Sequence, residues 1–182
     1  MKSRLLVMFG IILIAWGASA RAESTAFGDW FWDFSDNDDF VFAATMNSDG
    51  RILGQYCYYN EEYCIYVVSF GTLCTEGDKY PVLLNTETFS KSVEMVCGHI
   101  YKDANVFYFT DFDEIDSAVR SSPSIGYALA MKEGRFKVVR FSLSGSGKAI
   151  DAMREAAEPL WGGGENDSSR SKAKKFKSEE FL

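Results

Sequence analysis

The sequence predicts a mainly β domain with some α, an antiparallel β-sandwich or meander that carries two or three short helices in its C-terminal half. Three observations predict this class. Short runs rich in aromatic and β-branched residues alternate with turn residues up to residue 100. Helical spacing of apolar residues appears only after residue 110. The cysteines are even in number and lie within the strand-rich part, where cross-links can join neighbouring strands.

The strand-rich part is divided by recognisable turns. The segment Asn47-Ser48-Asp49-Gly50 is a strong hairpin signal, because glycine accepts the positive φ that such turns need. A second hairpin turn is expected at Asn60-Glu61. Strands are therefore expected at residues 27–34, 39–46, 51–59, 62–70, 82–84 and 93–99.

The pattern changes after residue 102. Thr110 is the expected N-cap of a first helix, and Pro159 is expected to stop the last one. The predicted order is a strand at 106–109, a helix at 111–120, a short helical stretch at 124–132, a strand at 135–143 and a helix at 148–158. We expect one globular domain over residues 23–161 and a disordered Gly/Ser/Lys-rich tail over residues 162–182.

The four cysteines predict two disulfides in an exported domain. Three pairings are possible, and we favour Cys57–Cys64 with Cys74–Cys97. If Asn60-Glu61 is the turn, Cys57 lies directly opposite Cys64, with Cβ atoms about 4.5–5.5 Å apart, near bridging distance. The cysteine spacings contain no C-x-x-C pair, which argues against a zinc site.

The first 22 residues predict a cleavable signal peptide. Lys2 and Arg4 precede an apolar run at residues 5–16, and the small residues that follow allow cleavage after Ala20 or Ala22. The run is shorter than the roughly 20 residues that a transmembrane helix needs. The mature protein is thus expected to be periplasmic or secreted, with no transmembrane segment.

The charge of the expected mature chain limits its partners. Removing residues 1–22 leaves 16 basic against 26 acidic residues, a net charge of −10. Such a field repels phosphate backbones, so we expect no nucleic acid partner. The expected partner is an unknown protein or envelope component, and the field would suit a cationic one.

Several chemistries are excluded by detail. The segment 144–148 lacks the Gly and the Ser or Thr that a phosphate-binding loop needs around Gly147-Lys148. Counted from Asp36, Val41 and Asn47 stand where a calcium-binding EF-hand loop needs Gly and Glu. Asp33, Asp36, Asp38 and Asp39 are expected to form a solvated acidic turn, with an irregular calcium site as the alternative.

The sequence has a single histidine, His99, so a zinc site built on several histidines is excluded. It also lacks the G-x-S-x-G motif that is typical of a serine nucleophile. His99 is two residues from Cys97, but a bridged Cys97 would be no nucleophile. We expect no catalytic residue, no metal and no cofactor.

Aromatic residues provide the candidate binding residues. Tyr56, Tyr58 and Tyr63 are expected to line one face of a hairpin, with Trp30 and Trp32 on a neighbouring strand. An exposed aromatic face can stack on sugars or bind peptides. The alternative is that these side chains form core, because aromatic residues dominate core burial.

Three short motifs along the domain are those of a known family. They are Phe27-Gly28-Asp29-Trp30, the run 93–98 with Cys97, and the run 138–153, which joins a strand to a helix through Ser-x-x-Gly. The chain resembles the invasion-associated locus B family of small exported bacterial proteins over most of residues 27–155. The resemblance implies a periplasmic or surface β-sandwich without known catalytic residues, linked to host-cell interaction. It transfers no functional residue.

Three functions follow as hypotheses. The first is a non-enzymatic exported protein that binds another protein or an envelope component, with an exposed aromatic patch. The second is a hydrolase of envelope polymers, with Asp29 and Asp33 as its carboxylate pair, about 5–10 Å apart in a groove. The third is a structural periplasmic protein without a ligand.

Overall fold

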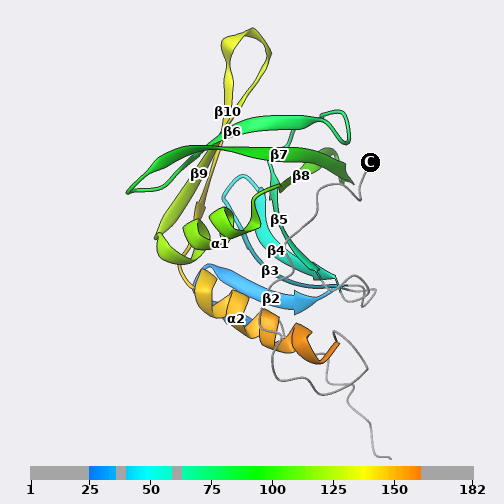
Figure 1. Cartoon of the computed structure of the whole chain (residues 1–182), viewed down its shortest axis with the longest axis vertical. Helices are drawn as coiled ribbons and strands as arrows, with labels where there is room; N and C mark the ends of the chain where they lie inside the picture. The colour runs from blue at the N-terminus through cyan, green and yellow to red at the C-terminus, as the bar shows by residue number, and fades with distance from the viewer. Residues whose placement is uncertain (1–24, 36–39, 59–62, 161–182) are drawn as a thin grey trace, which may run out of the picture.

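The computed structural model describes residues 25–35, 40–58 and 63–160. They form one ten-stranded antiparallel sheet with two α-helices (Figure 1). The neighbour order is β1-β2-β3-β4-β5-β8-β7-β6-β9-β10, so the first five strands form a meander. The prediction of a mainly β fold with helices in the C-terminal half is confirmed.

The strands alternate with short turns in the first half and with helices later. The strands are β1 Thr25–Phe27, β2 Trp30–Phe34, β3 Phe40–Met46, β4 Ile52–Tyr58, β5 Tyr63–Ser69, β6 Lys79–Asn85, β7 Ser90–Tyr101, β8 Ala104–Phe109, β9 Ser124–Ala130 and β10 Phe136–Ser142. The helices are α1 Phe112–Ser121 and α2 Ser146–Ala157, with the 3₁₀ turns η1 Lys132–Gly134 and η2 Glu158–Leu160.

Both helices cover the same face of the sheet, which forms the core. Strand residues alternate between the two faces, so every second side chain points at the helices. Helix α1 contributes Ile115 and Val119 to this core, and α2 contributes Ile150 and Met153, all of them fully buried. Helix α2 lies along β1–β3, and α1 lies over β5 and β9.

The two ends of the sheet meet beside α2. The backbone N–H of Asp29 donates to Ser144 O at 3.0 Å, and the Trp30 indole N–H donates to Ser142 O at 3.0 Å. The Ser142 hydroxyl donates to Asp29 Oδ2 at 2.5 Å. Two of the short motifs that carry the family resemblance, at residues 27–30 and 138–153, are therefore in contact, although the bonded residues are 112 and 113 positions apart in the sequence.

The hairpin and disulfide predictions are confirmed. Asn47 and Gly50 close the turn between β3 and β4. Cys57 pairs directly with Cys64 in the β4–β5 register, and they form one disulfide, while Cys74 and Cys97 form the other. The turn predicted at Asn60-Glu61 lies outside the described residues.

Three local predictions are wrong. Residues 124–130 form strand β9 instead of a helical stretch, because β6 and β10 pair with it on both sides and Ile125, Tyr127 and Leu129 alternate into the core. The cap of α1 is Asp111, whose side chain accepts the N–H of Glu114, instead of Thr110. The strand predicted at 27–34 is broken into β1 and β2 at residues 28–29, where Gly28 has a φ of 60°.

The predicted signal peptide (1–22) and tail (162–182) lie outside the described residues. Within the described part, neither helix is long and apolar enough to span a bilayer.

Candidate binding groove

Strands β3, β4 and β5 carry aromatic side chains on the face opposite the core. In β3, Val41 and Ala43 are fully buried against the helices, so Phe40 and Phe42 point the other way. In β4 the same alternation turns Cys57 inward, and it turns Tyr56 and Tyr58 outward. The sequence thus builds an apolar core on one face and a half-buried aromatic layer on the other.

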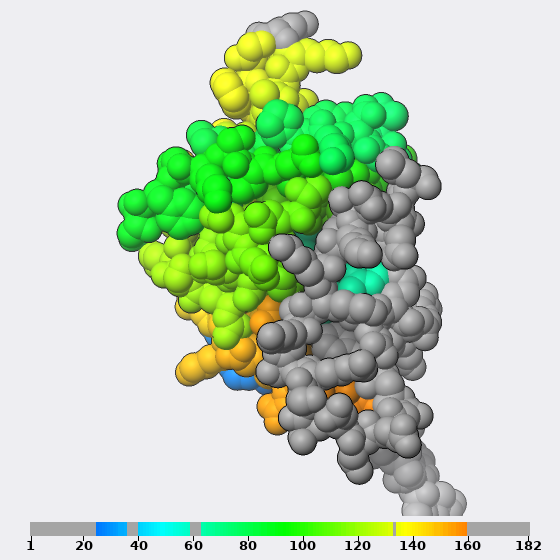
Figure 2. All heavy atoms as spheres, viewed as in Figure 1, coloured from blue at the N-terminus to red at the C-terminus, as the bar shows by residue number. Residues whose placement is uncertain are grey.

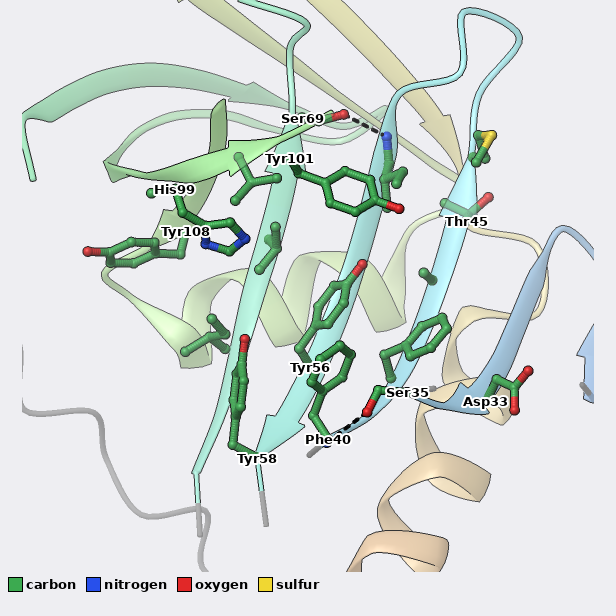
Figure 3. Close-up of a pocket in the computed structure, with 18 of the residues that line it drawn as sticks. Asp33, Ser35, Phe40, Thr45, Tyr56, Tyr58, Ser69, His99, Tyr101 and Tyr108 are labelled. Atoms are coloured by element: carbon green, nitrogen blue, oxygen red, sulfur yellow. Dashed lines mark hydrogen bonds between the residues drawn. The ribbon is translucent and has the colours of Figure 1, made fainter. Parts of the chain in front are cut away.

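This layer lines a cavity of about 940 Å³, here called the aromatic groove (Figure 3). It crosses the strands from β2 to β8 and β7. Its volume is within the range of small-molecule and peptide pockets. The aromatic side chains lining it are Phe31, Phe34, Phe40, Phe42, Tyr56, Tyr58, Tyr63, Tyr101 and Tyr108.

Neighbouring rings of the groove pack on one another. Phe42 and Tyr56 stack with centroids 5.6 Å apart, and Tyr58 and Tyr63 stack at 5.3 Å. Phe40 is tilted against Phe42, Tyr56 and Tyr58 at 5.4–6.1 Å. In the two stacked pairs one face of each ring is therefore covered by its neighbour.

The β7–β8 hairpin closes one side of the groove. Its register shifts between Cys97 and Ile100, an irregularity that redirects the following side chains. Tyr101, half exposed, reaches from β7 over the strands toward the ring of Tyr56 (Figure 3). Buried Asn105 holds the irregularity, because its amide donates to Gly98 O at 2.7 Å and its carbonyl accepts the Cys74 N–H at 3.0 Å.

Each disulfide lies beneath a part of the groove. Cys57–Cys64 cross-links β4 and β5 on the core face, directly behind the tyrosines of that hairpin. Cys74–Cys97 ties the loop after β5 to β7. Next to it, the Gly77 N–H donates to Cys97 O at 2.8 Å, which places the neighbouring Glu76 at the groove. The cross-links brace both walls.

The charges of the groove are acidic. Its lining includes Asp33 on β2 and Glu76 at the opposite end, with His99 near Tyr108 and away from Asp33 (Figure 3), and among the described residues it includes neither lysine nor arginine. Burial, then the charge of Glu76, raises the pKa of Tyr108. Burial, then the neighbouring Tyr101 and Tyr58 hydroxyls, raises the pKa of Tyr56 far above its usual value. These tyrosines are neutral donors and acceptors at physiological pH.

Three of the five predicted binding residues lie together in the groove and two do not. Tyr56, Tyr58 and Tyr63 line it. Trp30 is fully buried on the opposite face, and Trp32 packs against the core there. The prediction that these two tryptophans share a face with the tyrosines is wrong, because it assigned them to the wrong face of β2. Trp30, Trp32 and Phe34 share the face of β2 that packs on the core, with Phe34 at the strand end also reaching the groove lining, whereas Phe31 and Asp33 face the groove.

The sequence analysis did not assign the other groove residues. Phe40 and Phe42 could have been found, because they alternate with small apolar residues along β3. Tyr101 and Tyr108 reach the groove through the order β5-β8-β7, which places later strands beside β5. No local pattern encodes that neighbour relation.

The proposed carboxylate pair is not brought together. Asp33 lines the groove, but Asp29 accepts the Ser142 hydroxyl where the sheet ends meet and is absent from the lining. Four residues along an extended chain separate them by about 13 Å. Among the described residues no group of three His, Cys, Asp or Glu side chains could hold a metal, and the acidic turn at 36–39 lies outside them. Cys97 is disulfide-bonded.

The fold and the groove define a mainly β scaffold that is braced by two disulfides and carries a concave aromatic face. No protein-family model matches the chain, and no curated protein matches it by sequence. Among solved structures, the fold is similar to that of invasion associated protein B from Bartonella henselae. The TM-score is 0.53 at 14% identity, over 75% of this chain and 99% of that one, so the likeness extends to the fold.

Proposed function

We propose that this protein is an exported, non-enzymatic binding protein whose aromatic groove receives a basic, apolar-rich peptide segment of a partner. The observation that carries this proposal is the lining of the groove, in which nine aromatic rings stand with two carboxylates and without lysine or arginine among the described residues. Carboxylates attract cations, and aromatic rings offer apolar surface on which the aliphatic stems of basic side chains pack.

The stacking of neighbouring rings in the groove favours a peptide ligand over a sugar ligand. Sugar stacking needs an open aromatic face, and the stacking of Phe42 on Tyr56 and of Tyr58 on Tyr63 takes up one face of each of these rings. Lysine and arginine chains instead lay apolar stems along such a surface and keep their charge at its rim. Asp33 and Glu76 stand at the two ends, where such charges would lie.

Export is supported by three features. The first residues have the order of a signal peptide. Two disulfides join all four cysteines, which is typical of oxidising compartments. The fold is similar to that of a protein named for invasion. Mass spectrometry of the extracytoplasmic fraction should find a chain beginning at Arg21 or Glu23 and lacking four hydrogens; a cytoplasmic chain with four thiols would refute export.

Binding is tested with two labelled peptides of equal length, one alternating leucine with lysine and one alternating leucine with glutamate. Fluorescence anisotropy should show saturable binding of the lysine peptide. The Tyr56→Ser/Tyr58→Ser variant should bind this peptide about tenfold more weakly, equivalent to about 1.4 kcal/mol, and should bind the glutamate peptide as the wild type does.

The matched control is Leu73→Ser, which removes a side chain that is 68% exposed and lies outside the groove lining. It should bind as the wild type does. Absence of binding of the lysine peptide, or an unchanged affinity of the tyrosine variant for it, would remove the peptide proposal. Preferential binding of chito-oligosaccharides would replace it with a sugar site, and their cleavage would restore the hydrolase hypothesis.

A further inference from the structure

A second surface lies apart from the groove, on the hairpin of β9 and β10. This hairpin projects beyond β6 and β7 as a separate finger (Figure 1), and Figure 2 shows its end standing clear of the body in yellow. Strand β10 is the last strand in the sheet order, so one of its edges has no neighbouring strand among the described residues. Such an edge is a template for pairing with another chain.

The hydrogen bonds of β10 identify which residues face outward along this edge. The carbonyl of Arg140 accepts the Asn47 side-chain amide at 3.2 Å, and that of Ser142 accepts the Trp30 indole at 3.0 Å. Since backbone groups alternate sides along a strand, Phe136 and Val138 also direct N–H and C=O outward. Their four backbone groups form the open part of the edge.

The side chains of the open segment divide into two faces. Phe136 is 66% exposed and Val138 is 51% exposed. The sheet register continues this apolar face onto Ala128 and the 47% exposed Leu83. Lys137 lies on the other face of the strand, as expected from the alternation.

The finger has the opposite charge to the domain. Residues 23–161 contain 11 basic and 22 acidic residues, yet residues 131–140 contain four of those basic residues and a single acidic one. The edge is therefore positive on an acidic protein, which selects an acidic partner.

The same charge disfavours pairing between two copies of this edge. An antiparallel pairing that uses the open groups of Phe136 and Val138 places Lys137 opposite the Lys137 of a second copy, and like charges opposite each other are unfavourable. A pairing centred on Val138 needs the Arg140 carbonyl, which Asn47 already occupies. Burial in lipid is disfavoured as well, because open strand edges are not tolerated in hydrocarbon.

We propose that the edge of β10 at Phe136–Val138 binds an extended segment of a partner protein in which apolar and acidic residues alternate, adding it as an eleventh, antiparallel strand. Its apolar residues pack opposite Phe136 and Val138, and a carboxylate stands opposite Lys137. Backbone hydrogen bonds provide the affinity, and the alternation of apolar and acidic side chains provides the specificity.

The test uses a labelled heptapeptide, Thr-Val-Glu-Val-Glu-Val-Thr with blocked ends, and its analogue with lysine in place of glutamate. In the Tyr56→Ser/Tyr58→Ser variant, whose groove is weakened toward lysine peptides, fluorescence anisotropy should show that the glutamate peptide binds at least about tenfold more tightly than the lysine peptide. In NMR spectra the Phe136 and Val138 amides should shift on binding. The Lys137→Glu variant should reverse the preference between the two peptides.

Val138→Pro removes one outward N–H without touching the ladder to β9, and should weaken binding about tenfold. Val138→Thr keeps the N–H and should bind almost normally, which separates the hydrogen bond from the side chain; circular dichroism melts report folding. Equal affinity for both peptides, no binding, or unchanged affinity of Val138→Pro overturns the proposal. A wild-type dimer that Val138→Pro dissociates, or flotation with anionic vesicles, also overturns it.

Discussion

Gly145 lies where the two ends of the sheet meet. It has a φ of 87°, and a Cβ atom there would collide with the Phe27 carbonyl. The backbone on either side is engaged, since Ser144 O accepts the Asp29 N–H and Ala149 N–H donates to Gly145 O. A side chain at this position would thus strain its own backbone and separate β1 from the start of α2.

We predict that Gly145→Ala lowers the free energy of unfolding by about 2 kcal/mol or more. The matched control is Gly147→Ala, two residues on inside α2, where a Cβ atom meets nothing within 4 Å. Alanine there should raise stability by about 0.5–1 kcal/mol, because it is a better helix former. Urea denaturation measures both; a tolerated Gly145→Ala would contradict the close approach.

A polar cluster within the core joins both helices to the sheet. Asp116 on α1 accepts hydrogen bonds from the Tyr66 hydroxyl at 2.7 Å and from Arg154 on α2 at 2.5 Å. Arg154 also donates to Gln55 Oε1 at 2.8 Å. Burial, then Asp116, raises the pKa of Tyr66 well above its usual value, so this tyrosine stays protonated in the folded protein.

At the scale of single elements, the start of α1 distinguishes two possible caps. Asp111 accepts the Glu114 N–H at 3.1 Å, whereas the Thr110 hydroxyl donates to Glu94 O at 3.3 Å. Asp111→Ala should cost about 1 kcal/mol of stability, the usual value of a lost N-cap. Thr110→Ala serves as the comparison and should cost less. Thermal unfolding of the two variants measures the difference, and the reverse order would restore Thr110 as the cap.

The two disulfides close loops of different length, with sequence separations of 7 and 23. From loop-closure entropy, Cys57→Ser/Cys64→Ser should cost about 2.4 kcal/mol and Cys74→Ser/Cys97→Ser about 3.4 kcal/mol. The second loss should also weaken peptide binding in the groove, because that bond holds the loop with Glu76. Denaturation and anisotropy measure both effects; an affinity unchanged in the second variant would show that the hydrogen bonds around Gly77 suffice.

At the scale of the whole molecule, buried tyrosines set the response to alkali. The pKa of Tyr66 and of Tyr127 is raised in the folded state, chiefly by burial, while in the unfolded chain it is about 10. Above that pH the unfolded chain releases protons that the folded protein keeps. Stability is therefore complete below a pH of about 10 and falls as the pH rises further, by up to about 1.4 kcal/mol per unit for each group.

Urea titrations between pH 8 and 11.5 measure this slope. Tyr127→Phe should reduce it with little loss of stability at neutral pH, because the Tyr127 hydroxyl is buried without a hydrogen-bond partner among the described residues. Tyr66→Phe should reduce the slope too, but should cost about 1–3 kcal/mol at neutral pH, since it deprives the Asp116 carboxylate of the hydrogen bond that the Tyr66 hydroxyl donates. An unchanged slope in both variants would contradict the raised pKa values.

Local sequence was sufficient for features that depend on neighbouring residues. The turn at Asn47–Gly50 and the strand alternation of β3–β5 determine the register of that meander, and this register places Cys57 opposite Cys64. The helical spacing after residue 110 was sufficient for α1 and α2, to within two residues at each end. Three of the groove tyrosines followed from the same hairpin register.

Only the tertiary structure decided the rest, because it depends on which distant segments lie side by side. Strand β9 is a strand because β6 and β10 satisfy its backbone on both sides, although its own residues allow a helix. Trp30 belongs to the core because α2, more than a hundred residues later, covers that face of the sheet. Short-range periodicity determines which side chains share a face of a strand, whereas long-range pairing determines which face is buried and which becomes a groove.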